Sequence, residues 1–316
     1  MDSLLFSLQV ILPVFLLMAL GYFLRRIRLI DGQFTKQANK LGFKVLLPAL
    51  LFYNIYQSDL HTLFDGKLVV FAAVCILAVV AALFVCIPLV EKDPAKCGAM
   101  IQGIFRSNYV IFGVPVAVNM FGQSAAPLAS MLAAIVIPMF NLLAVVVLEL
   151  FSPQETKSGS AAGRIVLGIV KNPLILGSLL GVVVVLCGIR LPSALEPFVS
   201  DVAKTATPLA LLVLGADFEW RAVGAYRKQI AICTIAKLVL LPAVVLPIAV
   251  ALGFRGPALG LLLILLAAPT AVSSYAMADQ MGADAVLAAQ LVVFTTVLSS
   301  LSLFVFVFLL KACALI

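Results

Sequence analysis

Long apolar runs separated by short polar segments dominate the chain. Six of these runs contain no charged residue: Ser3–Leu24, Leu68–Val90, Asn172–Ile189, Leu238–Phe254, Gly256–Ala278 and Ala285–Leu310. A membrane-spanning helix needs about 20 mostly apolar residues, so each run predicts one transmembrane helix. A further uncharged run, Ser107–Leu148, is long enough for two helices, with the turn-forming segment Phe121–Pro127 between them.

Two weaker runs complete the pattern. Leu41–Gln57 contains Lys44, and Leu195–Ala216 contains Asp201 and Lys204. Including both gives ten predicted spans, and the chain is therefore expected to be an all-α integral membrane protein that crosses the bilayer many times.

Basic residues are distributed unevenly over the predicted loops. The loops after odd-numbered spans hold 13 of the 21 Lys and Arg residues, and the opposite side holds 4. Cytoplasmic loops carry the excess of positive charge, so both termini are predicted to lie outside the cytoplasmic membrane. The first run could also be a cleavable signal peptide, but Arg25, Arg26 and Arg28 follow it and nothing basic precedes it, which favours a first span.

The composition excludes most other classes of protein. Of the 316 residues, 64% are hydrophobic and 11% are charged, whereas soluble domains carry about 25% charged residues. A soluble enzyme or a nucleic-acid-binding protein is therefore not expected, and the net charge of +7 fits loops beside anionic lipid.

The six cysteines are scattered singly and His61 is the only histidine, so no metal site or disulfide framework is predicted. Nucleotide-binding and hydrolase motifs are absent from the sequence, so we expect neither an enzyme nor a bound cofactor.

The two halves of the chain share rare residues at one offset. A shift of 160 residues superimposes Pro13 on Pro173, Gly21 on Gly181, Lys44 and Pro48 on Lys204 and Pro208, and Gly122 on Gly282. Internal duplication explains these matches better than chance in an apolar chain. Each half has five spans, an odd number, so the second half would insert upside down, as in many secondary transporters. The predicted units are a first repeat at 1–151, a cytoplasmic linker at 152–163 and a second repeat at 164–316.

The fourth and ninth spans carry the candidate binding residues. Each contains a proline beside small or polar residues, and free backbone groups in a membrane must face protein or a wet cavity. Unwound helices that contact a solute near the midplane are one interpretation, and simple proline kinks are the other. We expect the break in the fourth span at Gly113–Pro115. The candidates are Asn108, Tyr109, Gly113, Pro115, Pro269, Thr270, Ser273 and Ser274.

Intramembrane charges are the second set of candidates, because charge is costly there and often marks a pathway. Lys204 is placed deep in its span, one helical turn from Asp201, so the two can pair. Arg106 and Lys44 are expected near the cytoplasmic ends of their spans, where long side chains reach water. Asn141, after Pro138, either lines a cavity or caps a kink. Arg106, Asp201 and Lys204 are thus candidates for charge recognition or coupling.

Three stretches resemble the auxin efflux carrier family, which includes bacterial malate and malonate permeases. They are Asn39–Phe52, Phe105–Gly122 and Ala268–Thr296. The short linker is similar to that of the microbial, short-loop members rather than to the long loop of the plant exporters.

The resemblance implies a fold of the bile-acid-symporter and sodium–proton-antiporter type. Spans 1, 2, 6 and 7 would form a scaffold and the face of a homodimer, and spans 3–5 and 8–10 would form a transport unit that moves as an elevator. The broken helices would cross at the substrate site, where Asn108, Gly113 and Pro115 match the first crossover and Pro269 the second.

The predicted function is alternating-access transport of an organic acid anion, auxin-like or a dicarboxylate such as malate or malonate, across the inner membrane. Coupling to protons or sodium stays open. The alternative is a cation–proton exchanger of related fold, which would need carboxylates in the two broken spans, where none is found.

Overall fold

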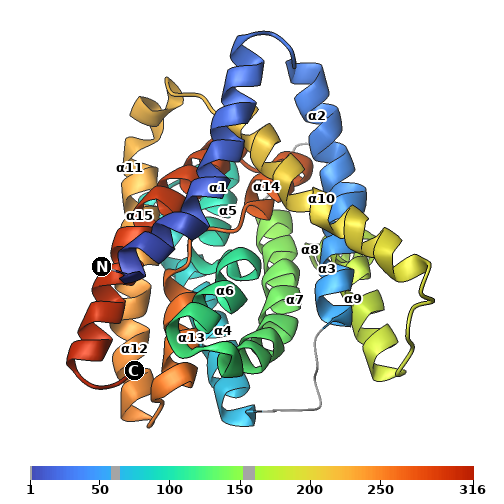
Figure 1. Ribbon diagram of the computed structural model, residues 1–316. Helices are drawn as coiled ribbons and strands as arrows, with labels where there is room; N and C mark the ends of the chain where they lie inside the picture. Colours follow the sequence, from blue (N-terminus) through green and yellow to red (C-terminus); the bar gives the residue numbers. More distant parts are fainter. Residues whose placement is uncertain (1, 58–64, 152–160) are drawn as a thin grey trace.

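The chain is all-helical in the computed structural model, which describes residues 2–57, 65–151 and 161–316 (Figure 1). Within these ranges the one strand-like feature is an isolated antiparallel bridge between Ser107 and Thr270. His61 and most of the predicted linker lie outside the described residues. The helical elements of the first half are α1 (Asp2–Arg26), α2 (Gly32–Leu41), a π-helical turn η1 (Gly42–Leu46), α3 (Leu47–Tyr56), α4 (Gly66–Val90), α5 (Pro94–Phe105), α6 (Tyr109–Phe121), a 3-10 turn η2 (Gln123–Ala125) and α7 (Ala126–Leu150).

The second half continues with helices of similar length. Its elements are α8 (Ala161–Lys171), α9 (Pro173–Leu186), α10 (Leu195–Ala216), α11 (Ala222–Ile235), a π-helical turn η4 (Ala236–Leu240), α12 (Leu241–Ala251), α13 (Gly256–Ala267), α14 (Ser273–Met281) and α15 (Ala285–Ala312).

The described helices have the length and composition expected of an integral membrane protein. Five stretches of described helix are long and apolar enough to cross a bilayer: Gly66–Val90, Gln123–Leu150, Leu195–Ala216, Ala222–Ala251 and Ala285–Ala312. Shorter apolar helices cover Ile111–Phe121, Pro173–Leu186 and Gly256–Ala267. Each apolar run of the sequence is covered by one helix or by two or three successive helical elements.

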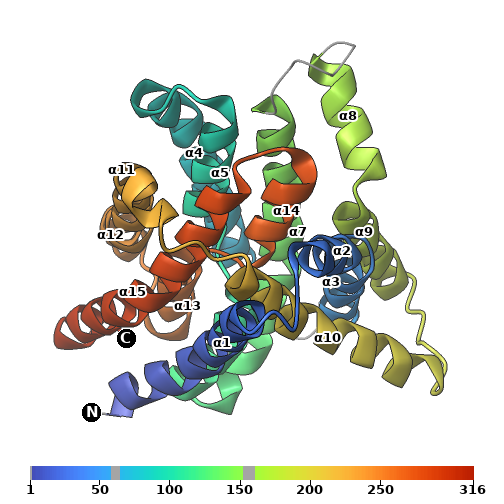
Figure 2. The ribbon, with the colours of Figure 1, turned by 90° about the horizontal axis from the view of Figure 1, so that it is seen from above.

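One group of helices brings the two halves of the chain together. Helix α1 packs along α10, and α3 packs against α9 and α10; α3 and α9 lie on the side away from α11 and α12 in Figure 2. Glycines at these contacts let backbones touch. A Cβ on Gly21 would lie 1.9 Å from the carbonyl oxygen of Leu212, and one on Gly181 would lie 3.0 Å from that of Phe52. Side chains at these two positions would therefore force the helices apart.

The other group encloses two deeply buried helices. Helices α4, α7, α11, α12 and α15 surround α5 and α13, which bury most of their residues. Helices α6 and α14 continue these two buried helices after a short break in each. This arrangement brings both breaks into the protein interior.

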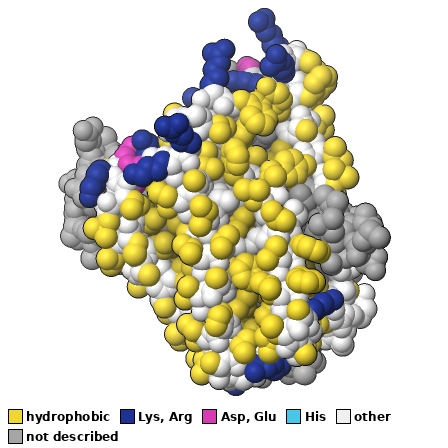
Figure 3. Space-filling view, turned by 90° about the vertical axis from the view of Figure 1, so that its left-hand side faces the viewer, with side chains coloured by type: hydrophobic (Ala, Val, Ile, Leu, Met, Phe, Trp, Pro, Cys, Tyr) yellow, Lys and Arg dark blue, Asp and Glu magenta, His cyan; other side chains and the backbone are white. Residues whose placement is uncertain are grey.

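The surface is that of a protein in lipid. In Figure 3, hydrophobic side chains cover most of the visible face, and Lys and Arg gather mainly at its upper end. The exposed side of α1 carries Leu12, Leu16, Leu20 and Phe23, which only an apolar solvent would cover favourably. Trp220 is also exposed, as expected of an interfacial anchor.

Candidate functional site

The two interrupted helices cross at their breaks. The extended segment between α5 and α6 lies antiparallel to the segment between α13 and α14. The N–H of Asn108 donates to the carbonyl of Pro269 at 2.8 Å, and the N–H of Ala271 donates to the carbonyl of Arg106 at 3.3 Å. Two backbone hydrogen bonds thus join the halves of the chain at the centre of the protein.

The position of the first break corrects the sequence prediction. The break covers Arg106–Asn108, whereas Gly113 and Pro115 lie inside the continuous helix α6. An interior proline removes one helical hydrogen bond without having to unwind the helix. Gly113 instead leaves room for an aromatic ring, because a Cβ there would lie 2.6 Å from Cε1 of Tyr109. In the second break, Pro269 follows an extended residue, as the proline ring favours.

Side chains satisfy the carbonyl groups that the breaks leave without a helical partner. The Thr270 hydroxyl donates to the carbonyl of Gly103 at 2.6 Å, and its backbone N–H donates to Oγ1 of Thr295 at 3.0 Å. The Ser107 hydroxyl donates to the carbonyl of Leu265. Polar groups without water are expensive in the membrane, so these hydroxyls stabilise the unwound backbone.

A small cavity of about 50 Å³ lies between the crossing and the helices α3, α9 and α10. Its volume suits a few water molecules. Of the predicted site residues, the structure brings Arg106, Asn108, Asn141 and Ser273 to its wall, together with Thr207 of α10. The cavity is thus the place where polar groups from both halves meet.

The remaining candidates do not line this cavity. Tyr109 borders a separate cavity of about 280 Å³, and Thr270 and Ser274 are buried in the crossing itself. Asp201 and Lys204 form the predicted pair at 3.8 Å, but their side chains are 79% and 72% exposed on the outside of α10. The pair therefore faces away from the cavity, although Lys204 lies near the middle of α10.

Arg106 is the charged group of the cavity. Only 3% of the residue is exposed, so the expectation that its side chain reaches water is wrong, because α5 begins at Pro94 and carries Arg106 to the crossing. Its guanidinium donates to Sδ of Met277 at 2.8 Å and to Oδ1 of Asn141. The ion pairs recorded among the described residues are Lys96–Asp93 and Lys204–Asp201, and neither includes Arg106. A buried guanidinium without a carboxylate favours an anion nearby.

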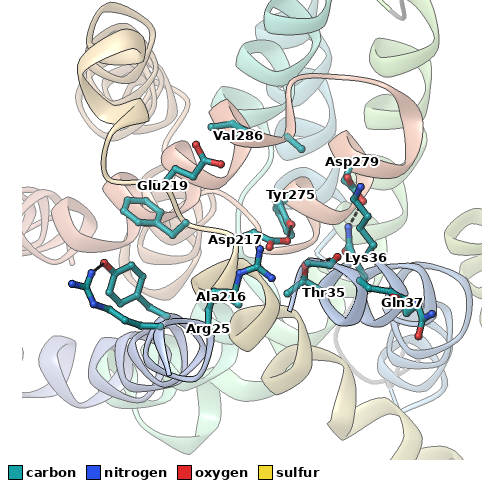
Figure 4. A pocket seen from close by; sticks show the side chains of 17 residues that line it. Arg25, Thr35, Lys36, Gln37, Ala216, Asp217, Glu219, Tyr275, Asp279 and Val286 are labelled. Atoms are coloured by element: carbon teal, nitrogen blue, oxygen red, sulfur yellow. Dashed lines mark hydrogen bonds between the residues drawn. The ribbon is translucent and has the colours of Figure 1, made fainter. Parts of the chain in front are cut away.

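A wider vestibule of about 910 Å³ opens between α1, α2, α10 and α14 (Figure 4). Acidic and basic side chains face it together. The Tyr275 hydroxyl donates to Oδ2 of Asp217 at 2.6 Å, and Nδ2 of Asn39 donates to Oδ2 of Asp279 at 2.5 Å. These two bonds hold α14 against α10 and α2, so they tie the two groups of helices together.

Several residues at the crossing were not recognised from the sequence. Ser107 and Thr295 are hydroxyl residues in apolar helices, a common pattern that gives little indication of a role. Lys237 has a clearer signal, a lone cation within an apolar stretch, but the sequence analysis gave it no role. It is 0% exposed, and its ammonium contacts the crossing.

Interrupted helices that cross beside a buried polar cavity are typical of secondary transporters, and the chain is an integral membrane protein with that arrangement. Over residues 6–307 it matches the family described as "Membrane transport protein", the auxin efflux carrier family, and it belongs to that family. The resemblance of the three sequence stretches is thereby confirmed. Proteins of such families are generally not enzymes.

Curated relatives cover nearly the whole chain. "Uncharacterized transporter YfdV" of Escherichia coli (strain K12) is 25% identical over 289 residues, which are 85% of this chain and 87% of the relative. An "Uncharacterized transporter" of Methanothermobacter thermautotrophicus is 24% identical over 304 residues, 94% of this chain and 96% of the relative. A protein of Rhizobium meliloti named "Putative malonate transporter" is 26% identical over 293 residues, 92% of this chain and 91% of the relative.

Proposed function

We propose that the protein is a secondary transporter of small organic acid anions, and that the cavity at the crossing holds the carboxylate group of the substrate. The observation that carries this proposal is the buried guanidinium of Arg106 at the cavity wall, which has no ion pair among the described residues. A carboxylate that enters the cavity supplies the missing negative charge. None of the described residues that line the cavity is Asp or Glu, which disfavours the alternative of a cation–proton exchanger.

Helix dipoles add to this attraction. Helices α6 and α14 both begin at the breaks, at Tyr109 and Ser273. The N-terminal end of a helix carries about half a positive charge and unpaired N–H groups, and such ends bind anionic substrates in transporters with interrupted helices. Two N-termini, one guanidinium and the amide of Asn108 suit a mono- or dicarboxylate. The printed name of the Rhizobium meliloti relative supports malonate or a similar diacid.

The two groups of helices suit an elevator of inverted repeats. Under the offset of 160 residues, Gly21 corresponds to Gly181 and Phe52 to Leu212. The contact of Gly21 with Leu212 and that of Gly181 with Phe52 are therefore the same contact made twice, as a two-fold related pair of repeats requires.

Helices α6 and α14 also end at matching glycines, although the ψ angles differ, 178° at Gly122 and 23° at Gly282. Gly122 and Gly282 end α6 and α14 with φ of 80° and 79°, which favours glycine at both positions. On this basis we propose repeats at 1–151 and 164–316, a linker at 152–163, and a ten-span layout.

Alternating access would then move one group of helices against the other. The group around α1, α3, α9 and α10 acts as the scaffold and as the face of a homodimer, and the group that holds the crossing carries the substrate. Lys and Arg are concentrated in the loops on one side, which is therefore the cytoplasmic side. We propose on this basis that both termini lie on the outer side of the inner membrane.

Uptake into proteoliposomes tests the proposal. We expect accumulation of radiolabelled malonate, malate or indole-3-acetate, measured with and without imposed proton and sodium gradients. Arg106→Met is the control for protein-dependent uptake, since it keeps a side chain of similar length without the charge. Transport of cations or neutral sugars alone, with no organic anion carried or bound, would overturn the proposal.

A further inference from the structure

Lys237 is a buried cation directly behind the crossing. It lies in the π-helical turn η4, between α11 and α12, and its residue is 0% exposed. The ammonium donates to the carbonyl of Ile104 at 3.1 Å and to Oγ of Ser107 at 2.9 Å. Neither ion pair recorded among the described residues includes it, so the ammonium has only neutral oxygens as partners there.

These oxygens belong to the C-terminal end of α5. Ile104 is in its last turn, and Ser107 in the break donates in turn to the carbonyl of Leu265, in the last turn of α13. The C-terminal end of a helix carries a partial negative charge. Lys237 therefore places a full positive charge where the negative ends of two half-helices come together.

That position has a known use in this class of protein. In secondary transporters with interrupted helices, the C-terminal ends of half-helices and the carbonyls of the unwound segments coordinate the coupling Na⁺ or H⁺. Here a side chain fixed to the protein already bonds those oxygens. We propose that the Lys237 ammonium is a tethered replacement for a coupling cation, so that anion transport by this chain requires no sodium.

The local structure holds the ammonium in place. A π-helical turn carries an extra residue and often marks a functional position. The neighbouring carbonyl of Leu238 accepts a hydrogen bond from the hydroxyl of Ser302 on α15, so the distorted turn is satisfied within the protein. Ser107, the second acceptor of Lys237, also lines the substrate cavity. The charge is thus connected to the site through a single hydroxyl.

Sodium replacement tests the transport consequence, which rests on the proposed function. Malonate uptake by the unmodified protein is expected to stay the same within about twofold when choline replaces sodium at constant ionic strength. A fall of about tenfold or more without sodium overturns the tethered-cation proposal but leaves anion transport standing.

Thermal unfolding of the detergent-purified protein tests the same idea without any substrate. Lys237→Met is expected to lower the unfolding temperature, and Lys237→Arg is expected to restore most of it. The matched control is Lys204→Met, which removes an exposed lysine and is expected to leave the unfolding temperature unchanged. The unfolding measurement needs no transport. If anion uptake fails while the unfolding temperatures change as expected, only the proposed function is overturned.

Chemical rescue separates charge from packing. Lys237→Ala leaves a gap that n-propylammonium can fill with a charged group and n-propanol with a neutral one. We expect propylammonium to raise the unfolding temperature of Lys237→Ala and propanol not to. Equal effects of the two compounds, or a Lys237→Met variant as stable as the parent, would show that the ammonium is not needed and would overturn the proposal.

Discussion

Asn108→Ala is the most direct test of the substrate cavity. The residue is 6% exposed and lies at the cavity wall, and its side chain makes no hydrogen bond within the part of the chain that the structure describes. The bonds that hold the break are made by its backbone, to Pro269 at 2.8 Å and from Phe112 at 3.2 Å. Removal of the amide therefore leaves the crossing intact and takes one neutral donor from the cavity.

The expected loss follows from that one contact. A hydrogen bond to a charged group contributes about 1.5–3 kcal/mol. At about 1.4 kcal/mol per decade, the affinity for the anion falls roughly ten- to a hundredfold. Asn108→Asp should bind still more weakly, because it sets a carboxylate against the substrate carboxylate.

Equilibrium binding of radiolabelled malonate to the purified protein measures the effect, with thermal unfolding measured on the same samples. Asn54→Ala is the matched control, since Asn54 borders the separate cavity beside Tyr109. A folded Asn108→Ala variant with unchanged affinity would remove Asn108 from the site. A large drop in unfolding temperature would instead mean that the side chain holds the break, contrary to the structure.

Substitutions at three further positions, Arg106, Gly21 and Glu91, test the cavity, the helix packing and the stability of the fold. Arg106→Met should abolish measurable anion binding, and Arg106→Lys should recover only part of it because the planar fork is lost; isothermal titration with malonate checks both. Gly21→Leu should destabilise the protein by about 1–3 kcal/mol through overpacking, seen as a lower unfolding temperature, whereas an unchanged temperature would contradict the close contact. Glu91 accepts a hydrogen bond from Gln229 at 2.6 Å, which holds the pKa of its carboxyl below the usual value. Its contribution to stability is therefore present at neutral pH and is lost as the pH falls through that lowered pKa, so Glu91→Gln should flatten the acid side of the curve of unfolding temperature against pH.

The sequence predicted the helices better than the break. Uncharged runs such as Leu68–Val90 and Ala285–Leu310 coincide with α4 and α15 because the thickness of the bilayer sets their length. The break in α5–α6 was misplaced because Pro115 is the obvious local breaker, whereas the actual break depends on a partner far along the chain. The hydrogen bonds from Asn108 to Pro269 and from Ala271 to Arg106 have no local signature.

The positions of the charged candidate residues were also predicted only in part from the sequence. The spacing of Asp201 and Lys204 correctly indicated a pair, but helical spacing does not tell which side of the helix faces the protein. Arg106 was placed near the membrane edge because it directly precedes the uncharged run Ser107–Leu148. Its burial follows from helix α5, which the mixed sequence before Phe105 obscured.

The antiparallel pair of hydrogen bonds at the crossing bears on how the protein is made. The ribosome delivers α5 and α6 to the membrane about 150 residues before the segment that completes them. Until Pro269, Ala271 and Lys237 arrive, Arg106 and the carbonyl end of α5 lack the partners found in the finished fold. A chain truncated before α13 should therefore be a substrate for membrane proteases, and co-expression of the two separated halves should protect both from degradation.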